Sequence, residues 1–137
     1  MIILDTNVIA ALMRRDAPIV DWLDTQPRQS VWTSSVSVYE TRFGIEILAV
    51  GRRRRDLERT FEGFLREDIG GRVLPFDTPA AESAGRVAAE RRRTGRTIEI
   101  RDVQIAGIVI ARKATLATGN VRHFAGIRLS LIDPWSR

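Results

Sequence analysis

Short apolar runs alternate along the chain with longer stretches in which apolar residues recur every three or four positions. Short runs bounded by polar residues are typical of buried strands, and the longer period is typical of amphipathic helices. The pattern predicts strands at Met1–Asp5, Val31–Ser34, Val73–Phe76, Ala114–Thr118 and Leu129–Ile132. It predicts helices at about 7–13, 17–25, 36–48, 53–67, 79–93 and 102–113.

Local signals sharpen two of these elements. Thr78 and Pro79 supply a capping hydroxyl and a proline at the first position of the fifth helix, and Arg91–Arg93 followed by Gly95 mark its end. The stretch 103–111 is apolar nearly all round, which predicts a core helix. The first strand and the last two have the composition of strands buried on both faces.

Strands that alternate with helices, without a long polar linker, indicate a single α/β domain over residues 1–137. The sheet should be mostly parallel and covered by helices on both faces. A chain of 137 residues, 44% hydrophobic, can bury roughly two thirds of its unfolded surface.

Composition excludes several kinds of site. The chain has no cysteine and one histidine, His123, which excludes disulfides, thiolate zinc sites and histidine-cluster metal sites. Any metal must therefore be held mainly by oxygen. Lysine and arginine exceed acidic residues by 22 to 17, which favours a polyanionic partner. Neither a membrane-spanning run nor a signal peptide is evident, so we expect a cytoplasmic protein.

Candidate chemistry begins at the ends of two predicted strands. In open α/β sheets, ligand sites form at the carboxyl ends of the strands. Asp5 ends the first strand, and Thr118, Gly119 and Asn120 end the fourth. If these strands are neighbours, Asp5 and Asn120 lie on the same rim of the sheet.

Two further carboxylates stand out by position. Glu40 shares a helix face with Val36, Phe43, Gly44 and Ile47, which predicts a charged group on a buried stripe. An unpaired charge there would cost several kcal/mol, so it requires a cation, a metal or a hydrogen-bond network.

Asp102 opens the most apolar helix, aligned with Ile105, Ala106 and Val109. Together with Asp5 and Glu40 it could converge on a divalent cation. Such a site activates water for attack on a phosphodiester.

Each acid also has a structural interpretation. Asp5 could cap the helix that begins near Val8, Asp102 could be a helix N-cap, and Glu40 could pair with an arginine. We interpret Asp77 as a loop or cap residue. Glu99 lies close to Asp102 in sequence, but its spacing does not require it to join the site.

Five blocks in order and spacing resemble the PIN-domain ribonucleases, above all the VapC-type toxins of bacterial toxin–antitoxin pairs, including the FitB-like branch. The blocks are "ILDTNVIAAL", "TSSVSVYETRFGI", "GRTIEIRDVQIAGIVIA", "ATLATGNVRHF" and "LIDPW", and they extend from Ile2 to Trp135. The resemblance implies a three-layer α/β/α sandwich with a sheet of four or five strands. It also implies an acidic pocket that binds Mg²⁺ or Mn²⁺ and cleaves RNA.

The resemblance assigns roles residue by residue. Asp5, Glu40 and Asp102 match the family's first three acidic ligands. Thr6, Asn7 and Thr118 match small polar residues that line the pocket. The fourth acidic position departs from the family pattern, because Asn120 and His123 occupy the places where an aspartate is common. One metal should therefore bind well and a second weakly.

His123 could contact phosphate or assist proton transfer, although a partly exposed residue without a role is the favoured interpretation. The basic runs Arg52, Arg53, Arg54, Arg55 and Arg91, Arg92, Arg93, with Arg96, could guide RNA or dock an acidic antitoxin tail, or be solvated helix ends. The aromatic residues are scattered singly, so no base-stacking platform is visible. The family also implies a homodimer and a small cognate antitoxin.

Two other functional classes compete with a ribonuclease. Haloacid-dehalogenase-like phosphatases place a second aspartate two residues after the first, where this chain has Asn7. A catalytically weak or inactive RNA-binding module would need Asp5 but not Glu40. A nuclease should lose cleavage in Glu40→Gln, whereas a binding module should keep its affinity.

Overall fold

The protein is built on a parallel sheet whose strands lie where the sequence pattern places them. The computed structural model describes residues 1–136. In this part of the chain five strands form one sheet in the order β3-β2-β1-β4-β5, and every pairing is parallel. They are β1 (Ile2–Leu4), β2 (Val31–Ser34), β3 (Val73–Leu74), β4 (Thr115–Ala117) and β5 (Ser130–Ile132).

The helices also follow the predicted order, with boundaries shifted by a few residues. They are α1 (Thr6–Met13), α2 (Ala17–Asp24), α3 (Ser35–Glu46), α4 (Arg52–Gly63), α5 (Thr78–Arg93) and α6 (Ile100–Ala111). Short turns of 3₁₀ helix at Arg28–Ser30 and Val121–Phe124 were not predicted, since such turns lack a periodic signal. The predicted helix 53–67 continues beyond α4 only as a π-helical turn, Phe64–Asp68.

The capping residues differ from two of the sequence interpretations. Asp77, rather than Thr78, caps α5, and its carboxylate accepts a hydrogen bond from the backbone N–H of Ala80 at 3.1 Å. Glu99, rather than Asp102, caps α6 by accepting from the backbone N–H of Arg101. Asp102 is therefore not the N-cap. Its side chain lies in the first turn of α6 and takes no part in capping the helix.

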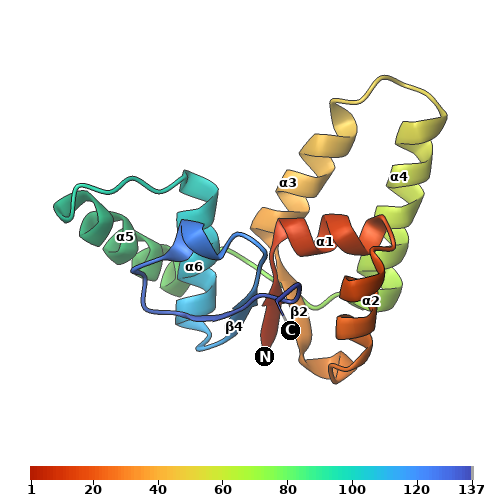
Figure 1. Ribbon diagram of the computed structural model, residues 1–137. Coiled ribbons are helices and arrows are strands. Elements are labelled where there is room, and N and C mark those ends of the chain that lie inside the picture. Colours follow the sequence, from red (N-terminus) through yellow and green to blue (C-terminus); the bar gives the residue numbers. More distant parts are fainter. Residues whose placement is uncertain (137) are drawn as a thin grey trace.

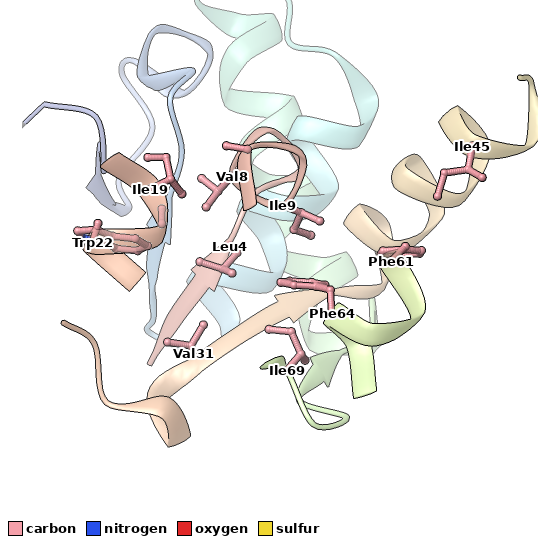
Figure 2. Packing of buried hydrophobic residues seen from close by; sticks show 12 residues of the cluster. Leu4, Val8, Ile9, Ile19, Trp22, Val31, Ile45, Phe61, Phe64 and Ile69 are labelled. Carbon is pink, nitrogen blue, oxygen red and sulfur yellow. The ribbon is translucent and has the colours of Figure 1, made fainter. Parts of the chain in front are cut away.

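Helices cover both faces of the sheet (Figure 1), and a hydrophobic cluster lies on each face. On one face, α1, α2 and α4 pack on the sheet around Leu4, Ile9, Trp22, Phe61 and Phe64 (Figure 2). On the other face, α5 and α6 cover a second cluster that includes Ile3, Ile105, Val109, Leu116 and Phe124. Ile3 and Leu4 belong to opposite clusters because successive strand residues point to opposite faces. The arrangement is the expected three-layer α/β/α sandwich.

The prediction that the last strand is buried on both faces is wrong. Ser130 is exposed, and Leu131 and Ile132 are only half-buried, because β5 forms an edge of the sheet. An apolar run alone does not distinguish an edge strand from a central one. β1 and β4, by contrast, are central and largely buried, as predicted.

The α3–α4 pair extends beyond the rest of the protein as a helical hairpin (Figure 1). The base of α3 begins at the carboxyl end of β2, so its first turns lie over the rim of the sheet. Over residues 1–136 we find no helix long and apolar enough to cross a membrane.

Candidate active site

The pocket forms where β1 and β4 end side by side. Leu4 pairs with Ala117, and the backbone N–H of Asp5 donates to the carbonyl of Ala117 at 2.9 Å. Asp5 and Thr118, the next residue of each chain segment, are thus held at one rim of the sheet. This is the place where parallel α/β sheets form ligand sites.

Asp5 is almost fully buried and surrounded by donors. Its Oδ1 accepts from the backbone N–H of Thr6 at 2.8 Å, and its Oδ2 accepts from the Thr118 hydroxyl at 2.7 Å and from Asn7 Nδ2 at 3.2 Å. Asn7 in turn accepts from the backbone N–H of Gly119 at 2.9 Å. Asp5 therefore caps α1, and the same carboxylate is fixed in the pocket. The cap and pocket interpretations of this residue are compatible.

Trp135 covers the strand end that carries Thr118. A Cβ atom added to Gly119 would lie 2.8 Å from a ring carbon of Trp135 and 3.5 Å from Asn7 Oδ1, so only glycine allows this approach. The indole N–H donates to Asp16 at 3.3 Å. The C-terminal "DPW" segment thus supports the strand end on which the pocket is built.

Glu40 reaches the pocket from α3. Its Oε1 accepts from the Thr6 hydroxyl at 2.8 Å, and its Oε2 lies 3.5 Å from Arg101 Nη1. The inference that Glu40 lies on a buried stripe is wrong, because Phe43, Gly44 and Ile47 on the same face are exposed. Glu40 is partly buried because the first turns of α3 lie beside α1 and α6, not because the whole face is covered.

Asp102 reaches the pocket from α6 and contacts the only histidine of the chain. His123 Nδ1 lies 3.0 Å from Asp102 Oδ2. His123 therefore lies beside the acidic pocket. Its side chain is 54% exposed, so the expected partial exposure is confirmed, and a role in the chemistry stays a prediction. Asn120 contributes its backbone N–H, which donates to the Thr118 hydroxyl at 3.0 Å, while the residue itself is exposed.

Burial and mutual repulsion oppose the negative charges of the pocket. Burial raises the pKa of Asp5, against hydrogen bonds from Thr118 and Thr6, and the charge of Asp102 adds to the rise. Burial also raises the pKa of Asp102, against the effect of His123, with Glu99 and Glu40 adding to the rise. A nearby cation would stabilise both carboxylates in their charged form.

The donor chemistry of the pocket suits a hard divalent cation, since its carboxylates supply only oxygen ligands. In the arrangement described for residues 1–136, however, no three histidine or acidic side chains are placed to hold one ion together. Asp102 is turned to His123 and Glu40 to Thr6 and Arg101. Coordination by all three carboxylates would require side-chain rotations.

Most of the basic residues proposed for RNA lie outside this pocket. Arg54 pairs with Glu46 and Glu58. Arg91 is wrongly placed among the RNA contacts, because it is buried and donates to the carbonyls of Ala125 and His123 at 2.7 and 3.2 Å. The exposed members of the two clusters are Arg52, Arg53, Arg55, Arg92 and Arg93, and Arg96 is also exposed.

Sequence reasoning missed Arg101, which lies between two carboxylates at the pocket. Its Nε donates to Glu99 Oε1 at 3.0 Å, and Nη1 approaches Glu40. Its place directly before Asp102, in the first turn of a helix, was the available signal. Hydrogen bonds from Arg101 lower the pKa of Glu99, although slight burial acts in the opposite direction.

Comparison with curated proteins identifies relatives along nearly the full chain. A "Plasmid stability protein StbB" of Pseudomonas syringae pv. tomato is 36% identical over 98% of this chain and 99% of its own length. A "VapC ribonuclease Y4jK" of Sinorhizobium fredii is 34% identical over 98% of both chains. "Toxin FitB" of Neisseria gonorrhoeae is 31% identical over 98% of this chain and 99% of its own.

Comparison with solved structures and family models agrees with these relatives. A structure of FitAB bound to an IR36 DNA fragment contains a chain that superposes with a TM-score of 0.90, at 31% identity, over 100% of this chain and 97% of that one. The PIN domain model matches residues 2–128. With the strand order, the rim carboxylates and these matches in agreement, the chain belongs to the PIN domain family.

Proposed function

We propose that this protein is a metal-dependent endoribonuclease and the toxin of a toxin–antitoxin pair. The observation that carries the proposal is the convergence of Asp5, Glu40 and Asp102 on one rim of a PIN-type sheet, where burial raises the pKa of two of the three. The relatives named as a ribonuclease and a toxin support the same activity. We propose RNA as its substrate and the cytoplasm, where RNA is turned over, as its location.

The three carboxylates are the groups that would hold Mg²⁺ or Mn²⁺, with fewer than four acids favouring one tightly bound ion. When bound, the cation supplies charge neutralisation and an activated water for in-line attack on phosphorus. Thr118 and Asn7 fix the orientation of Asp5, and Thr6 orients Glu40, through the hydrogen bonds they donate. His123 Nδ1 lies 3.0 Å from Asp102, and we assign its imidazole the role of a proton donor in the reaction.

Cleavage of a mixed pool of structured RNAs tests the proposal. The purified protein should cleave with Mg²⁺ or Mn²⁺ and stop cleaving in EDTA. Asp5→Ala should lower the rate at least about a hundredfold, because it removes the most buried carboxylate of the pocket. Asp56→Ala removes an exposed carboxylate on α4 that pairs with Arg59, and it should cleave as the unmodified protein does.

Cleavage that persists in EDTA, or an Asp5→Ala protein as active as the unmodified one, would contradict metal-assisted hydrolysis at this pocket. Calorimetry with Mn²⁺ gives an independent measurement. The unmodified protein and Asp56→Ala should bind the ion, and Asp5→Ala should bind it much more weakly.

Two protein partners complete the proposal. A small cognate antitoxin is supported by the relative named as a toxin and by the neighbouring structure that contains FitAB on DNA. A second copy of this chain is supported by exposed apolar residues at the pocket side of α3. Tyr39, Phe43 and Ile47 follow one another at intervals of four residues, and Ile100 lies beside Tyr39 and Phe43. We refer to these four residues as the α3 surface.

A further inference from the structure

Arg101 occupies an unusual place for a cation. It lies in the first turn of α6, directly before Asp102, and its guanidinium lies between Glu99, at 3.0 Å, and Glu40, at 3.5 Å. Apart from His123, it is the only basic residue in the described chain that is paired with one of the three pocket carboxylates. Its side chain remains 38% exposed.

Glu99 orients the side chain of Arg101, but not all of its N–H donors have a partner among the described residues. Glu99 accepts from Nε and also from the backbone N–H of Arg101 at 2.8 Å, so one carboxylate fixes both ends of the residue. Among residues 1–136, no partner accepts a hydrogen bond from Nη2. Arginine has five N–H donors in a planar fork, so donors are left for another ligand.

RNA that enters this pocket meets a concentration of negative charge. Glu99 lies beside Asp102 and adds its charge to that of the three carboxylates. A phosphodiester needs a local cation to approach them closely. Other exposed arginines are spread over α4, α5 and several loops, and one of them, Arg122, precedes His123 directly in sequence. Among the described residues, none of these arginines pairs with Asp5, Glu40 or Asp102, whereas Arg101 pairs with Glu40.

We propose that Arg101 binds the phosphate backbone of RNA at the acidic pocket, with Glu99 as the residue that orients it. The proposal rests on the proposed ribonuclease function and names a substrate-contacting residue for it. A guanidinium forms paired, charge-assisted hydrogen bonds with phosphate oxygens, which a lysine cannot reproduce. A purely structural counter-ion of Glu40 is the competing role.

Binding of a fluorescein-labelled single-stranded oligoribonucleotide in EDTA, followed by anisotropy over a series of salt concentrations, tests this role without cleavage. Arg101→Ala should weaken binding about tenfold, the effect of losing one charge-assisted contact. It should also lower the slope of log K against log salt by about 0.7. Arg101→Lys should keep most of the slope but lose part of the affinity. Arg59→Ala, an exposed arginine of α4 paired with Asp56, should bind as the unmodified protein does.

Steady-state cleavage in Mn²⁺ separates the two roles. A phosphate contact predicts that kcat/KM falls in Arg101→Ala and only partly recovers in Arg101→Lys. A counter-ion predicts tighter Mn²⁺ binding and faster cleavage in Arg101→Ala, because Glu40 is released. Unchanged affinity and slope, that faster cleavage, or an unmodified protein that does not bind RNA would each overturn the proposal. A protein that binds RNA through Arg101 but never cleaves would contradict the proposed function and leave this inference standing.

Discussion

Asp102 is a carboxylate of the pocket whose charge lowers the stability of the folded protein at neutral pH. It stands half-buried in the first turn of α6, near two other acidic side chains that repel it. Because its pKa is raised above 3.8 in the folded protein, the folded state binds a proton more readily than the unfolded chain does. Stability therefore falls as pH rises through the raised value.

Asp102→Asn should accordingly increase the free energy of unfolding at neutral pH, by about 1 kcal/mol or less, while removing RNA cleavage. Lowering the pH should protonate Asp102 in the unmodified protein, so the difference between the two proteins should shrink as pH falls toward 3.8. Urea unfolding at several pH values measures it. A difference that stays constant with pH, or a less stable variant at neutral pH, would contradict the argument.

The acids of the pocket and three of their partners, Thr6, Asn7 and Thr118, could be found from sequence, but the contacts of Arg101 and His123 could not. Asp5 follows a buried strand and Asp102 opens a core helix, and both positions lie on sequence patterns. Glu40 was found partly for the wrong reason, since Phe43 and Ile47 on its face are exposed. His123 meets Asp102 across 21 residues of sequence, and such a contact depends on tertiary packing that has no local signal.

Among the elements, α5 and α6 make the most extensive helix–helix contact, and a glycine lies within it. A Cβ atom added to Gly107 would lie 2.4 Å from the carbonyl oxygen of Ala80 and 2.7 Å from the Cβ of Ala84. The first is a backbone atom of α5 and the second is bonded directly to its backbone, so neither can move aside without shifting the helix. Because α6 carries Arg101 and Asp102, this contact also fixes the position of these two residues relative to the sheet.

Gly107→Ala should therefore lower the free energy of unfolding by about 2 kcal/mol, as overpacking does in a tight core. Gly85→Ala is a matched control, because Gly85 is an exposed glycine of α5 with no atom within 4 Å of an added Cβ. Alanine there should stabilise the protein by about 0.5 to 1 kcal/mol. Thermal unfolding of both variants tests this prediction. Equal shifts in their unfolding temperatures would show that α5 and α6 tolerate a wider separation.

The elements themselves were largely predictable, because strand and helix periods are local properties of the sequence. The exceptions are instructive. β5 has the apolar composition of a buried strand, but it is an edge strand with a neighbour on one side only. The order of strands in the sheet cannot be seen from the sequence pattern. Arg91 reads as part of a basic helix end, yet it points inward and holds the carbonyls of His123 and Ala125. Its role is to fix the loop that carries His123.

Across the whole molecule, exposed positive charge is spread out, whereas large exposed apolar side chains are concentrated. The acidic pocket lies at the rim of the sheet, and exposed arginines lie on α4, on α5 and in several loops. Four of the seven large exposed apolar residues in the described chain form the α3 surface. Tyr39 and Phe43 stack there with ring centroids 6.3 Å apart, which sequence spacing alone did not reveal. A soluble monomer rarely gathers so many large apolar side chains on one face.

The edges of the α3 surface make a second copy the suitable occupant. Glu99 and Arg101 lie beside Tyr39, Phe43 and Ile100 in one shallow depression. A surface with an apolar part and charges of both signs beside it can pair with a second copy of itself across a two-fold axis. The acidic residue of each copy can then face the basic residue of the other. Pairing through this face would bring two acidic pockets close together, since Glu40 and Arg101 adjoin it.

Ile47→Asp should therefore convert a dimer to a monomer, because it would bury an unpaired charge in the apolar pairing surface. Ile47 is 67% exposed, so the variant should remain folded. Ala88→Asp adds the same charge at an exposed position of α5 and should leave the dimer intact. Sedimentation velocity over a range of concentrations distinguishes the states. A monomeric unmodified protein, or an Ile47→Asp protein that still dimerises, would show that another partner covers this face.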